Sequence, residues 1–479
     1  MLIASGSGGR RGGFWACRSV SVLTDHLKSR QGQTPDLGIP TNGSVEFPRE
    51  IPGLDIDLNW SLAKDVVTPK SLAFRNLKVS DLQKKALGTT ESEALVVSGI
   101  GALSQAPDVF VIDGSPQLKG VRDHAVTRPQ FNRALRLVSE HLSSLPEVFV
   151  EDGAIGSAGG LTRGEVVTRC IADNATTSLS WKNMLCRAVM RPPLQFEHPL
   201  TVYLAPAFDA FADLESVGVT SRNLVVVNPE RGIVLCLGPA AALPGSTIRS
   251  AVFQAAASIA QRQGSAAVAL EGADLLQFNN GGTLSVVVDA GDILQSSPSL
   301  CSSGGVLLTS QGLARGFGGV HKSQGKSSAN SMAKGVVVDQ TSKTVFSRTA
   351  LPSLAVAPKT IIFVSKDGLG QSTAVGKIGS EADLLQVLLG RNSFPLARDP
   401  KAIAKGVWEF ASTSGANIFL VNSSSSELNG DADKVRELVE SIGSESKKRF
   451  KSSSPSAPES RRQQYQTWFP EPEAKPAAN

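Results

Sequence analysis

Short apolar runs alternate with amphipathic stretches along most of this 479-residue chain. A buried strand needs only roughly four to eight apolar residues, whereas an amphipathic helix repeats its apolar positions at spacings of three and four. Runs of the first kind occur at 94–98, 109–112, 148–150, 224–227, 233–237, 284–288, 361–364 and 418–421. The pattern therefore predicts short buried strands distributed over most of the chain.

Three other stretches predict helices. Asp399 followed by Pro400 is typical of an N-cap and a first helical position, and Gly415 lies where that helix would end. Two other stretches place apolar side chains on one helix face: Phe131, Leu135, Val138 and Leu142 in the first, and Val435, Leu438, Val439 and Ile442 in the second. Strands mixed with helices over the whole length predict an α/β (mixed α+β) fold.

The composition narrows the class of protein. No apolar run approaches the roughly 20 residues of a membrane-spanning helix, so we expect no membrane span. The formal net charge of +5 permits a nucleic-acid or acidic partner without identifying one. The five cysteines and five histidines are scattered, with no C-x-x-C pair and no H-E-x-x-H motif. We therefore expect neither a zinc site nor a disulfide framework, and we assign no metal and no cofactor.

The two ends of the chain differ in composition from its body. Residues 1–24 contain Arg10, Arg11 and Arg18 but no acidic residue, and they are rich in Ser and Gly. This composition predicts a mitochondrial transit peptide, with a disordered start as the alternative. Residues 25–70 predict an irregular N-terminal arm, and the Ser-, Pro-, Lys- and Arg-rich residues 444–479 predict a disordered basic tail.

Five segments carry a collinear resemblance to a known family. The stretch 169–187 reads RCIADNATTSLSWKNMLCR, similar without a gap to the pattern R-x-I-T-E-x-A-W-x-x-x-F-x-K-N-M-F-I-R. Upstream, 147–156 resembles E-L-F-V-x-D-G-x-x-G and 86–97 resembles T-E-S-G-A-L-V-V; downstream, 359–370 resembles K-V-I-F-L-T-A-D-A-F-G and 414–422 resembles A-G-A-x-x-Y-L-V-N-T. In this order the segments resemble ATP-dependent phosphoenolpyruvate carboxykinase.

The resemblance implies a phosphoenolpyruvate-carboxykinase-like two-lobed fold with the active cleft between the lobes. The N-terminal lobe would span 71–262, and the C-terminal, degenerate nucleotide-binding lobe would span 263–443. The family binds its substrate carboxylate with the arginine and lysines of G-x-x-T-G-R-S-P-K-D-K. Here Ser104 stands in place of the arginine, and Pro107 and Val109 replace the lysines. The carboxylate clamp is therefore absent, because a carboxylate is best held by the donor fork of an arginine.

The family's metal ligands are also missing from the matched positions. Arg249 stands near the position of the metal-binding lysine of Y-G-G-E-x-K-K, and an arginine stays protonated and cannot ligate a metal. The histidine that follows in the family falls near Ala269, Leu270 and Glu271.

The phosphate loop has lost its lysine. The family follows a hydrophobic strand with G-L-S-G-T-G-K-T-T, whereas the strand 284–288 here leads into an acidic loop with Gln295 near the lysine position. No lysine or arginine occurs from Gln263 to Ala314, so no local shift of the comparison can supply one. The stretch from Gly370 to Lys377 resembles a phosphate loop. However, five residues separate Gly370 from Gly376 where the loop has four, and Ile378 stands where the loop needs Ser or Thr. We expect a non-catalytic pseudoenzyme with no catalytic residues.

A mitochondrial, carboxykinase-like body with a basic tail resembles the paired guide-RNA-associated subunits of the kinetoplastid mitochondrial RNA-editing substrate-binding complex. This resemblance implies a subunit of an RNA-processing assembly in the mitochondrial matrix that binds RNA, in particular guide RNA, or supports a homologous RNA-binding partner in a homo- or heterodimer. Two alternatives remain: an inactive or regulatory carboxykinase paralogue, and a ligand-free structural subunit of a large mitochondrial assembly.

Basic residues near aromatic ones suit single-stranded RNA, although a charged tail is often only solvated. The candidate RNA-binding residues are Arg249, Arg315, Phe317, His321, Lys322, Lys326, Lys334, Lys377, Lys447, Lys448, Arg449 and Lys451. Phe317 would stack on bases within a Gly-rich basic loop, 315–322. The tail could instead dock on a protein partner, for which the candidate anchors are Tyr465, Trp468 and Phe469.

Overall fold

The computed structural model describes the greater part of the chain, in segments separated by gaps. The described residues are 49–52, 62–69, 72–87, 95–97, 108–112, 125–156, 166–186, 199–209, 222–264, 266–277, 284–289, 300–302, 304–318, 320–322, 336–339, 344–346, 355–365, 373–390, 399–444, 452–453 and 455–468. No helix among them is both long enough and apolar enough to cross a membrane.

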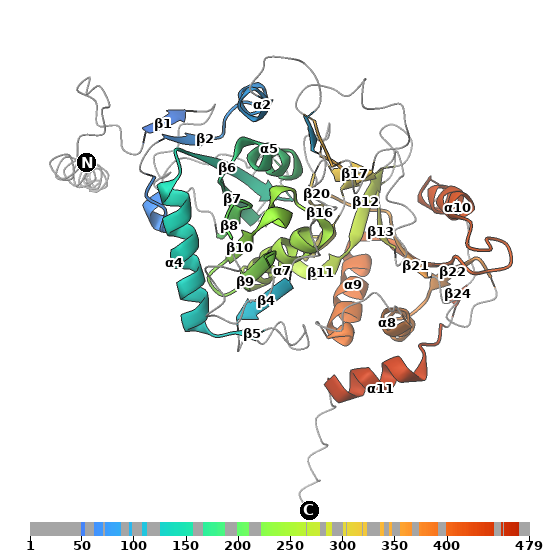
Figure 1. Ribbon diagram of the computed structural model, residues 1–479. Helices are drawn as coiled ribbons and strands as arrows, with labels where there is room; N and C mark the ends of the chain where they lie inside the picture. Colours follow the sequence, from blue (N-terminus) through green and yellow to red (C-terminus); the bar gives the residue numbers. More distant parts are fainter. Residues whose placement is uncertain are drawn as a thin grey trace, which may run out of the picture.

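A mixed nine-stranded sheet forms the first part of the molecule (Figure 1). Its spatial order is β1 (Arg49–Pro52), β2 (Leu72–Arg75), β6 (Glu147–Ile155), β7 (Val166–Ala172), β8 (Leu200–Ala205), β10 (Ile233–Leu237), β9 (Leu224–Asn228), β4 (Asp108–Ile112) and β5 (Ala125–Val126). Strands β7, β8 and β10 pair in parallel, whereas β6 with β7 and β9 with β10 pair antiparallel. Apolar residues on both sides of the central strands bury the sheet on both faces.

Helices cover the two faces of this sheet. On one face lies α4 (Arg128–Ser144), with Phe131, Leu135, Val138 and Leu142 buried as their spacing predicts. The short helix η1 (Leu62–Asp65) adds Leu62 to the same core. The other face is covered by α2 (Val79–Leu87), α5 (Ala175–Met184), η5 (Pro239–Ala242) and α7 (Ser246–Arg262).

Helix α7 joins the first part of the molecule to the second. It is buried along nearly its whole length, because the nine-stranded sheet packs on one side and strands β11 (Ala266–Glu271) and β15 (Gly305–Thr309) pack on the other. These two strands form a four-stranded sheet with β16 (Ala314–Gly316) and β20 (Ala355–Val356). One continuous core therefore spans both parts.

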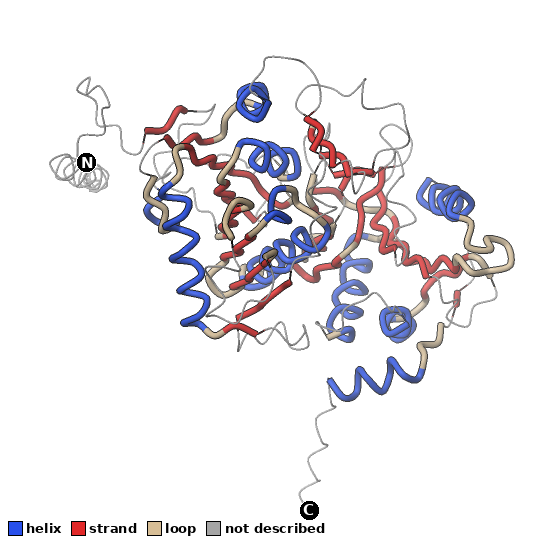
Figure 2. Tube along the Cα trace, viewed as in Figure 1, coloured by secondary structure: helices blue, strands red, loops and turns tan. Residues whose placement is uncertain are grey.

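A seven-stranded sheet organises the C-terminal part. Its order is β14 (Leu300–Ser302), β12 (Ala273–Gln277), β13 (Leu284–Asp289), β21 (Thr360–Ser365), β23 (Asn417–Asn422), β22 (Val375–Ile378) and β24 (Ser452–Ser453). Helices α8 (Glu381–Gly390) and α9 (Pro400–Ser414) cover one face, and α10 (Ala432–Ser444) covers the other (Figure 2). Its central strands β13, β21 and β23 run parallel.

A small sheet crosses the expected boundary between the lobes. Strand β3 (Leu95–Val97) pairs in parallel with β18 (Val337–Asp339), next to β19 (Thr344–Phe346) and β17 (Val320–Lys322). The sequence places β3 in the N-terminal lobe of residues 71–262, but its hydrogen-bonding partners belong to the C-terminal segment. The division at residue 262 is therefore not a clean break in the fold.

Helix α9 begins and ends at the predicted residues. The Asp399 side chain accepts a hydrogen bond from the Lys401 backbone N–H at 2.9 Å, Pro400 follows at the first helical position, and Gly415 adopts a left-handed conformation with φ 70°. The predicted strands and helices form, and the mixed α/β fold class is confirmed.

The C-terminal segment is more ordered than its composition predicts. Helix α11 (Glu459–Trp468) forms inside the predicted disordered tail of 444–479 and packs on α8. Ala457 is buried against Leu389, and the Tyr465 hydroxyl donates to an Asp399 carboxylate oxygen at 3.1 Å. These tertiary contacts order a polar helix that the local sequence alone does not predict.

Candidate functional site

A buried carboxylate holds two arginines on the α4 face of the nine-stranded sheet. Asp152 of β6 accepts hydrogen bonds from Arg75 Nε at 2.6 Å and from Arg169 Nε at 2.8 Å, and all three side chains are almost completely buried. Asn76 closes the group, because its amide oxygen accepts the Asp152 backbone N–H at 2.8 Å. Burial alone would raise the pKa of Asp152, but the two arginines outweigh it and hold that pKa well below its ordinary value.

The same network reaches the segment before β2. Arg169 Nη1 lies 3.3 Å from a carboxylate oxygen of Asp65, and Thr201 donates to the other Asp65 oxygen at 3.1 Å. The hydroxyl of Tyr203 donates to the Asp65 backbone oxygen. Because each charge has a buried partner, the network ties η1, β2, β6, β7 and β8 together and leaves its arginines unsuited to holding a substrate.

A second buried carboxylate anchors α5 to the sheet. Glu151 accepts hydrogen bonds from Lys182 Nζ at 2.6 Å and from Ser178 Oγ at 3.0 Å. Burial raises the pKa of Glu151, and the Lys182 ammonium opposes that rise. Lys182 lies in the segment 169–187 that carries the family resemblance, yet here it is an ion-pair partner of the scaffold.

Asp173 is a titratable group that the sequence reasoning did not single out. It follows β7 directly, is half-buried, and accepts hydrogen bonds from the Ala207 backbone N–H at 2.9 Å and from the Asn174 side chain at 2.6 Å. Burial raises its pKa to about 6, and these two hydrogen bonds limit the rise. Two features of the sequence could have identified it. Asp173 lies between a strand and the N-cap residue Asn174 of α5, and it aligns with the glutamate of the family pattern R-x-I-T-E-x-A.

The residues at the family's metal positions do not fit a metal ion. Arg249 is buried in the first turn of α7 and donates from Nη1 to the Pro244 backbone oxygen at 2.7 Å. Ala269 and Leu270 are buried core residues of β11, and Glu271 accepts from the Gln254 side-chain amide at 3.0 Å. A guanidinium and two aliphatic side chains offer no lone pair to a cation, so the four residues supply a single carboxylate, that of Glu271, which alone does not make a metal site. No group of three or more His, Cys, Asp or Glu side chains suited to a metal ion occurs in the parts of the chain that the structure describes.

Strand β13 is the strand that the sequence resemblance sets before the family's phosphate loop. Strand β13 lies in the middle of the seven-stranded sheet, antiparallel to β12 and parallel to β21. The loop that follows, with Gln295 near the lysine position, lies outside the described residues, as does Ser104 of the carboxylate clamp. The sequence that follows β13 lacks the cation that a phosphate cradle uses.

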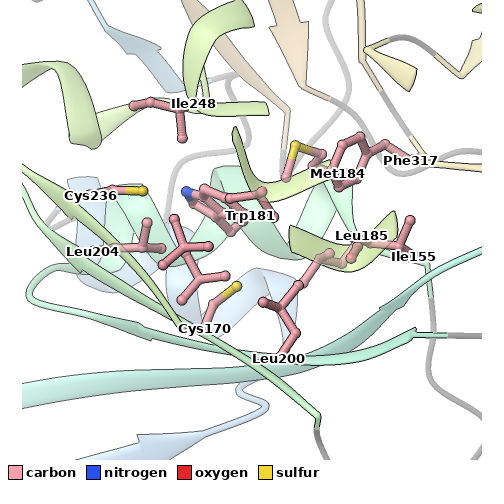
Figure 3. Packing of buried hydrophobic residues seen from close by; sticks show 14 of the residues in the cluster. Ile155, Cys170, Trp181, Met184, Leu185, Leu200, Leu204, Cys236, Ile248 and Phe317 are labelled. Atoms are coloured by element: carbon pink, nitrogen blue, oxygen red, sulfur yellow. The ribbon is translucent and has the colours of Figure 1, made fainter. Parts of the chain in front are cut away.

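The first residues of the predicted RNA-binding loop, 315–322, belong to the buried core. Arg315 and Phe317 are fully buried, and Arg315 donates from Nη1 to the Gly156 backbone oxygen at 2.9 Å. Figure 3 shows Phe317 beside Met184, and its ring also packs 6.2 Å from that of Phe253. The prediction that Phe317 stacks on RNA bases is therefore wrong, because its ring is enclosed by protein. Arg249 and Arg315 are likewise buried and are not surface contacts for RNA.

The remaining predicted RNA contacts fall into two groups. Lys377 lies exposed in β22, whose neighbours in the sheet are β23 and β24. His321 and Lys322 belong to β17, but their side chains lie outside the described residues. The other candidates also lie outside them: Lys326, Lys334, Lys447, Lys448, Arg449 and Lys451.

The predicted docking anchors are only partly described. Tyr465 lies half-buried on α11 and contacts Asp399, so its ring is used within the chain. Trp468 is the last residue of α11, with its side chain outside the described part, and Phe469 lies outside it altogether. The structure thus places one of the three anchors, and it places that anchor against α8 and α9.

The residues shared with the family build the scaffold of this chain. Asp152 and Arg169 form the buried ion pair, and Lys182 pairs with Glu151. Asn183 donates to the Phe346 backbone oxygen at 3.1 Å, which ties α5 to β19. The residues of this resemblance that the structure describes therefore hold the fold.

Comparison with known proteins finds one family for part of the chain. Residues 70–268 match the family model described as phosphoenolpyruvate carboxykinase, of the ATP type. No curated protein matches the chain. The matched segment contains the nine-stranded sheet from β2 onward, with α4, α5 and α7. Residues 70–268, with the buried ion pairs that support them, are thus similar to the phosphoenolpyruvate carboxykinase family.

Proposed function

We propose that this chain is a non-catalytic, carboxykinase-like subunit that binds RNA, or supports a homologous RNA-binding partner, within a mitochondrial RNA-processing assembly. One observation carries the non-catalytic part. From Gln263 to Ala314 the chain has no cation, although β13 within this stretch is the strand that leads into the family's phosphate loop. The nearby Arg249 and Arg315 cannot substitute, because both are buried and hydrogen-bonded to backbone oxygens.

A nucleoside triphosphate bound to a metal places several negative charges next to the loop, and enzymes of this chemistry stabilise them with lysine, arginine and divalent cations. Asp289 and Asp292 would add negative charge at this point in the sequence. Without compensating cations, desolvating the phosphates is unfavourable, so the cleft would not assemble a transition state for phosphoryl transfer.

The RNA-binding part rests on the distribution of basic residues. The chain has a net charge of +5, and residues 447–451 contain four cations and a phenylalanine. Exposed cations that displace counterions from phosphates give salt-dependent, sequence-independent RNA affinity. The acid-free, Arg-containing residues 1–24 support the proposed location in the mitochondrial matrix.

Two assays on the full-length chain test the proposal. The first follows oxaloacetate-dependent ATP consumption with Mg²⁺ and Mn²⁺ present, and we expect no turnover above a protein-free control. The second measures binding of 5′-triphosphorylated and 5′-hydroxyl forms of one RNA. Equal binding that weakens with salt supports RNA binding through surface cations, whereas preference for the triphosphate would show that the former nucleotide cleft still captures phosphates.

The family match favours one other candidate, an inactive or regulatory carboxykinase paralogue. That candidate predicts no RNA binding by the purified chain and stable association with an active carboxykinase. Measurable carboxykinase turnover by this chain alone would overturn the non-catalytic proposal.

A further inference from the structure

Three arginines from separate elements converge on the turn between β9 and β10. The turn consists of Pro229, Glu230, Arg231 and Gly232, and its neighbours are α4 on one face of the nine-stranded sheet and α7 on the other. Arg128 is the first residue of α4, Arg231 lies in the turn itself, and Arg262 is the last residue of α7. All three side chains are exposed. We call Arg128, Arg231 and Arg262 the turn cluster.

An ion pair and a hydrogen bond hold the guanidinium groups of Arg128 and Arg262 at the turn. Arg128 Nη2 lies 3.0 Å from a carboxylate oxygen of Glu230, and Arg262 Nη2 donates to the Pro229 backbone oxygen at 2.7 Å. Each contact uses one of the five N–H donors that a guanidinium carries. The remaining donor capacity of this pair faces the outside of the molecule, because both side chains are exposed.

Arg231 is placed by α4. Its Nη1 donates to the Asn132 side-chain oxygen at 3.1 Å, and its guanidinium carbon lies 5.9 Å from the centre of the Phe131 ring. This position over an aromatic ring orients the planar fork, which reduces the side-chain entropy lost on binding an anion. The turn also packs closely on Pro199. Gly232 has φ 65°, and a Cβ there would lie 1.9 Å from the Pro199 backbone oxygen.

Among the described residues, positive charge is in excess at the turn. In the described contacts of the three arginines, one carboxylate takes part, that of Glu230, and it pairs with Arg128. Arg128 also stands at the positive end of the α4 dipole, in a first turn without an acidic residue, where carboxylates are normally favoured. A cation at that position opposes helix stability, which indicates that the surface is suited to an anion.

The turn cluster is remote from Arg249, near the position that the sequence resemblance gives to a metal-binding lysine of the family. Arg249, at the position of a family metal ligand, and Arg262 lie thirteen residues apart on α7, which corresponds to about 20 Å along the helix. A ligand bound at the turn cluster would therefore not contact Arg249.

We propose that the turn cluster binds the phosphodiester backbone of a single RNA strand through the guanidinium groups of Arg128, Arg231 and Arg262. This inference rests on the proposed RNA-binding function and names a site for it. Guanidinium forks match phosphate oxygens in geometry as well as charge. An open surface with separate cations favours a ligand that carries many phosphates in succession, because each contact releases counterions.

The test is the affinity of the full-length chain for a 5′-hydroxyl single-stranded RNA, measured by fluorescence anisotropy over a range of salt concentrations. The test variant is the triple substitution R128Q/R231Q/R262Q. Its matched control is R133Q/R136Q/R222Q, which removes the same charge from exposed arginines outside the turn cluster. A third variant, R128K/R231K/R262K, keeps the charge and replaces the forked donors. Thermal unfolding of all four proteins checks that each one folds.

We expect R128Q/R231Q/R262Q to bind about tenfold or more weakly, and its slope of log affinity against log salt to fall by about 2, as three lost contacts to a single strand imply. The control should keep its slope and stay near the wild-type affinity, and the lysine variant should keep most of the slope. If both glutamine variants weaken equally, only net charge matters and the turn cluster is not the site, although RNA binding stands. If the wild-type chain binds no RNA, the proposed function itself fails.

Discussion

Arg315 and Gly156 join the two parts of the molecule at a point where no side chain other than hydrogen fits. Arg315 Nη1 donates to the Gly156 oxygen at 2.9 Å, and the Gly156 N–H donates to the Gly316 oxygen at 3.1 Å. Gly156 has φ 73°, and a Cβ built on it would lie 2.2 Å from the Arg315 Cβ. This close approach brings the end of β6 against β16.

The contact between Gly156 and the Arg315 side chain should not tolerate a larger residue at position 156. Gly156→Ala should destabilise the protein by at least about 3 kcal/mol, because it adds a steric clash with Arg315 to the strain of positive φ. Gly264→Ala is the matched control: Gly264 has φ 65° with nothing within 4 Å of its Cβ position. That variant should lose only about 1 kcal/mol. Chemical denaturation measures both, and equal losses would contradict the inferred clash.

The Glu151–Lys182 pair should show strong energetic coupling. Lys182→Met leaves the buried Glu151 carboxylate without its cation, so we expect a loss of about 3 kcal/mol in the free energy of unfolding. The double variant Glu151→Gln with Lys182→Met should lose less than the sum of the two single variants, because no buried charge remains unpaired. Strict additivity in this double-mutant cycle would mean that the ion pair contributes little.

Asp152 should govern stability in acid. Its pKa is lowered in the folded protein, so its contribution is complete above the unfolded pKa of about 4 and is lost as pH falls below that value. Asp152→Asn should lose about 3 to 5 kcal/mol at neutral pH, since two buried arginines lose their shared carboxylate. The measurement is denaturant unfolding from pH 7 to pH 3, over which the difference between the two proteins should shrink.

Asp173 should have the opposite effect on the pH dependence of stability from Asp152. Its folded pKa of about 6 exceeds the ordinary value of 3.8, so the folded state favours the protonated acid and stability falls as pH rises from about 4 through 6. Asp173→Asn mimics the neutral form and should gain about 1 to 2 kcal/mol over wild type at pH 8, with the gain vanishing near pH 4. A difference that does not change with pH would show that Asp173 does not titrate in this range.

Helix α11 should detach when its anchor is removed. Tyr465→Ala deletes the hydrogen bond to Asp399 and the packing near Leu389, so amide protons of 459–468 should exchange about tenfold faster. Gln466→Ala changes an exposed neighbour on the same helix and should leave the exchange rates near wild type. Equal exchange in the two variants would mean that α11 is held by other contacts.

Local patterns in the sequence determined much of the secondary structure. The four apolar positions of α4, the Asp399–Pro400 start of α9 and the apolar runs of β9, β10 and β13 are signals within a few residues, and they formed as predicted. Helix α7 carries no such one-sided pattern, because it is buried on nearly all sides between two sheets. Its helical state and central position follow from what packs around it.

The sequence also determined that the stretch from Gln263 to Ala314 supplies no lysine or arginine, whatever the fold. Only the tertiary structure decided what the remaining charged and aromatic residues do. Arg315 and Phe317 lie in a Gly-rich basic stretch that local composition describes as an exposed loop, yet distant segments bury both. Arg128, Arg231 and Arg262 are far apart in the chain and meet at one turn. Burial and convergence depend on long-range contacts, which a local pattern does not contain.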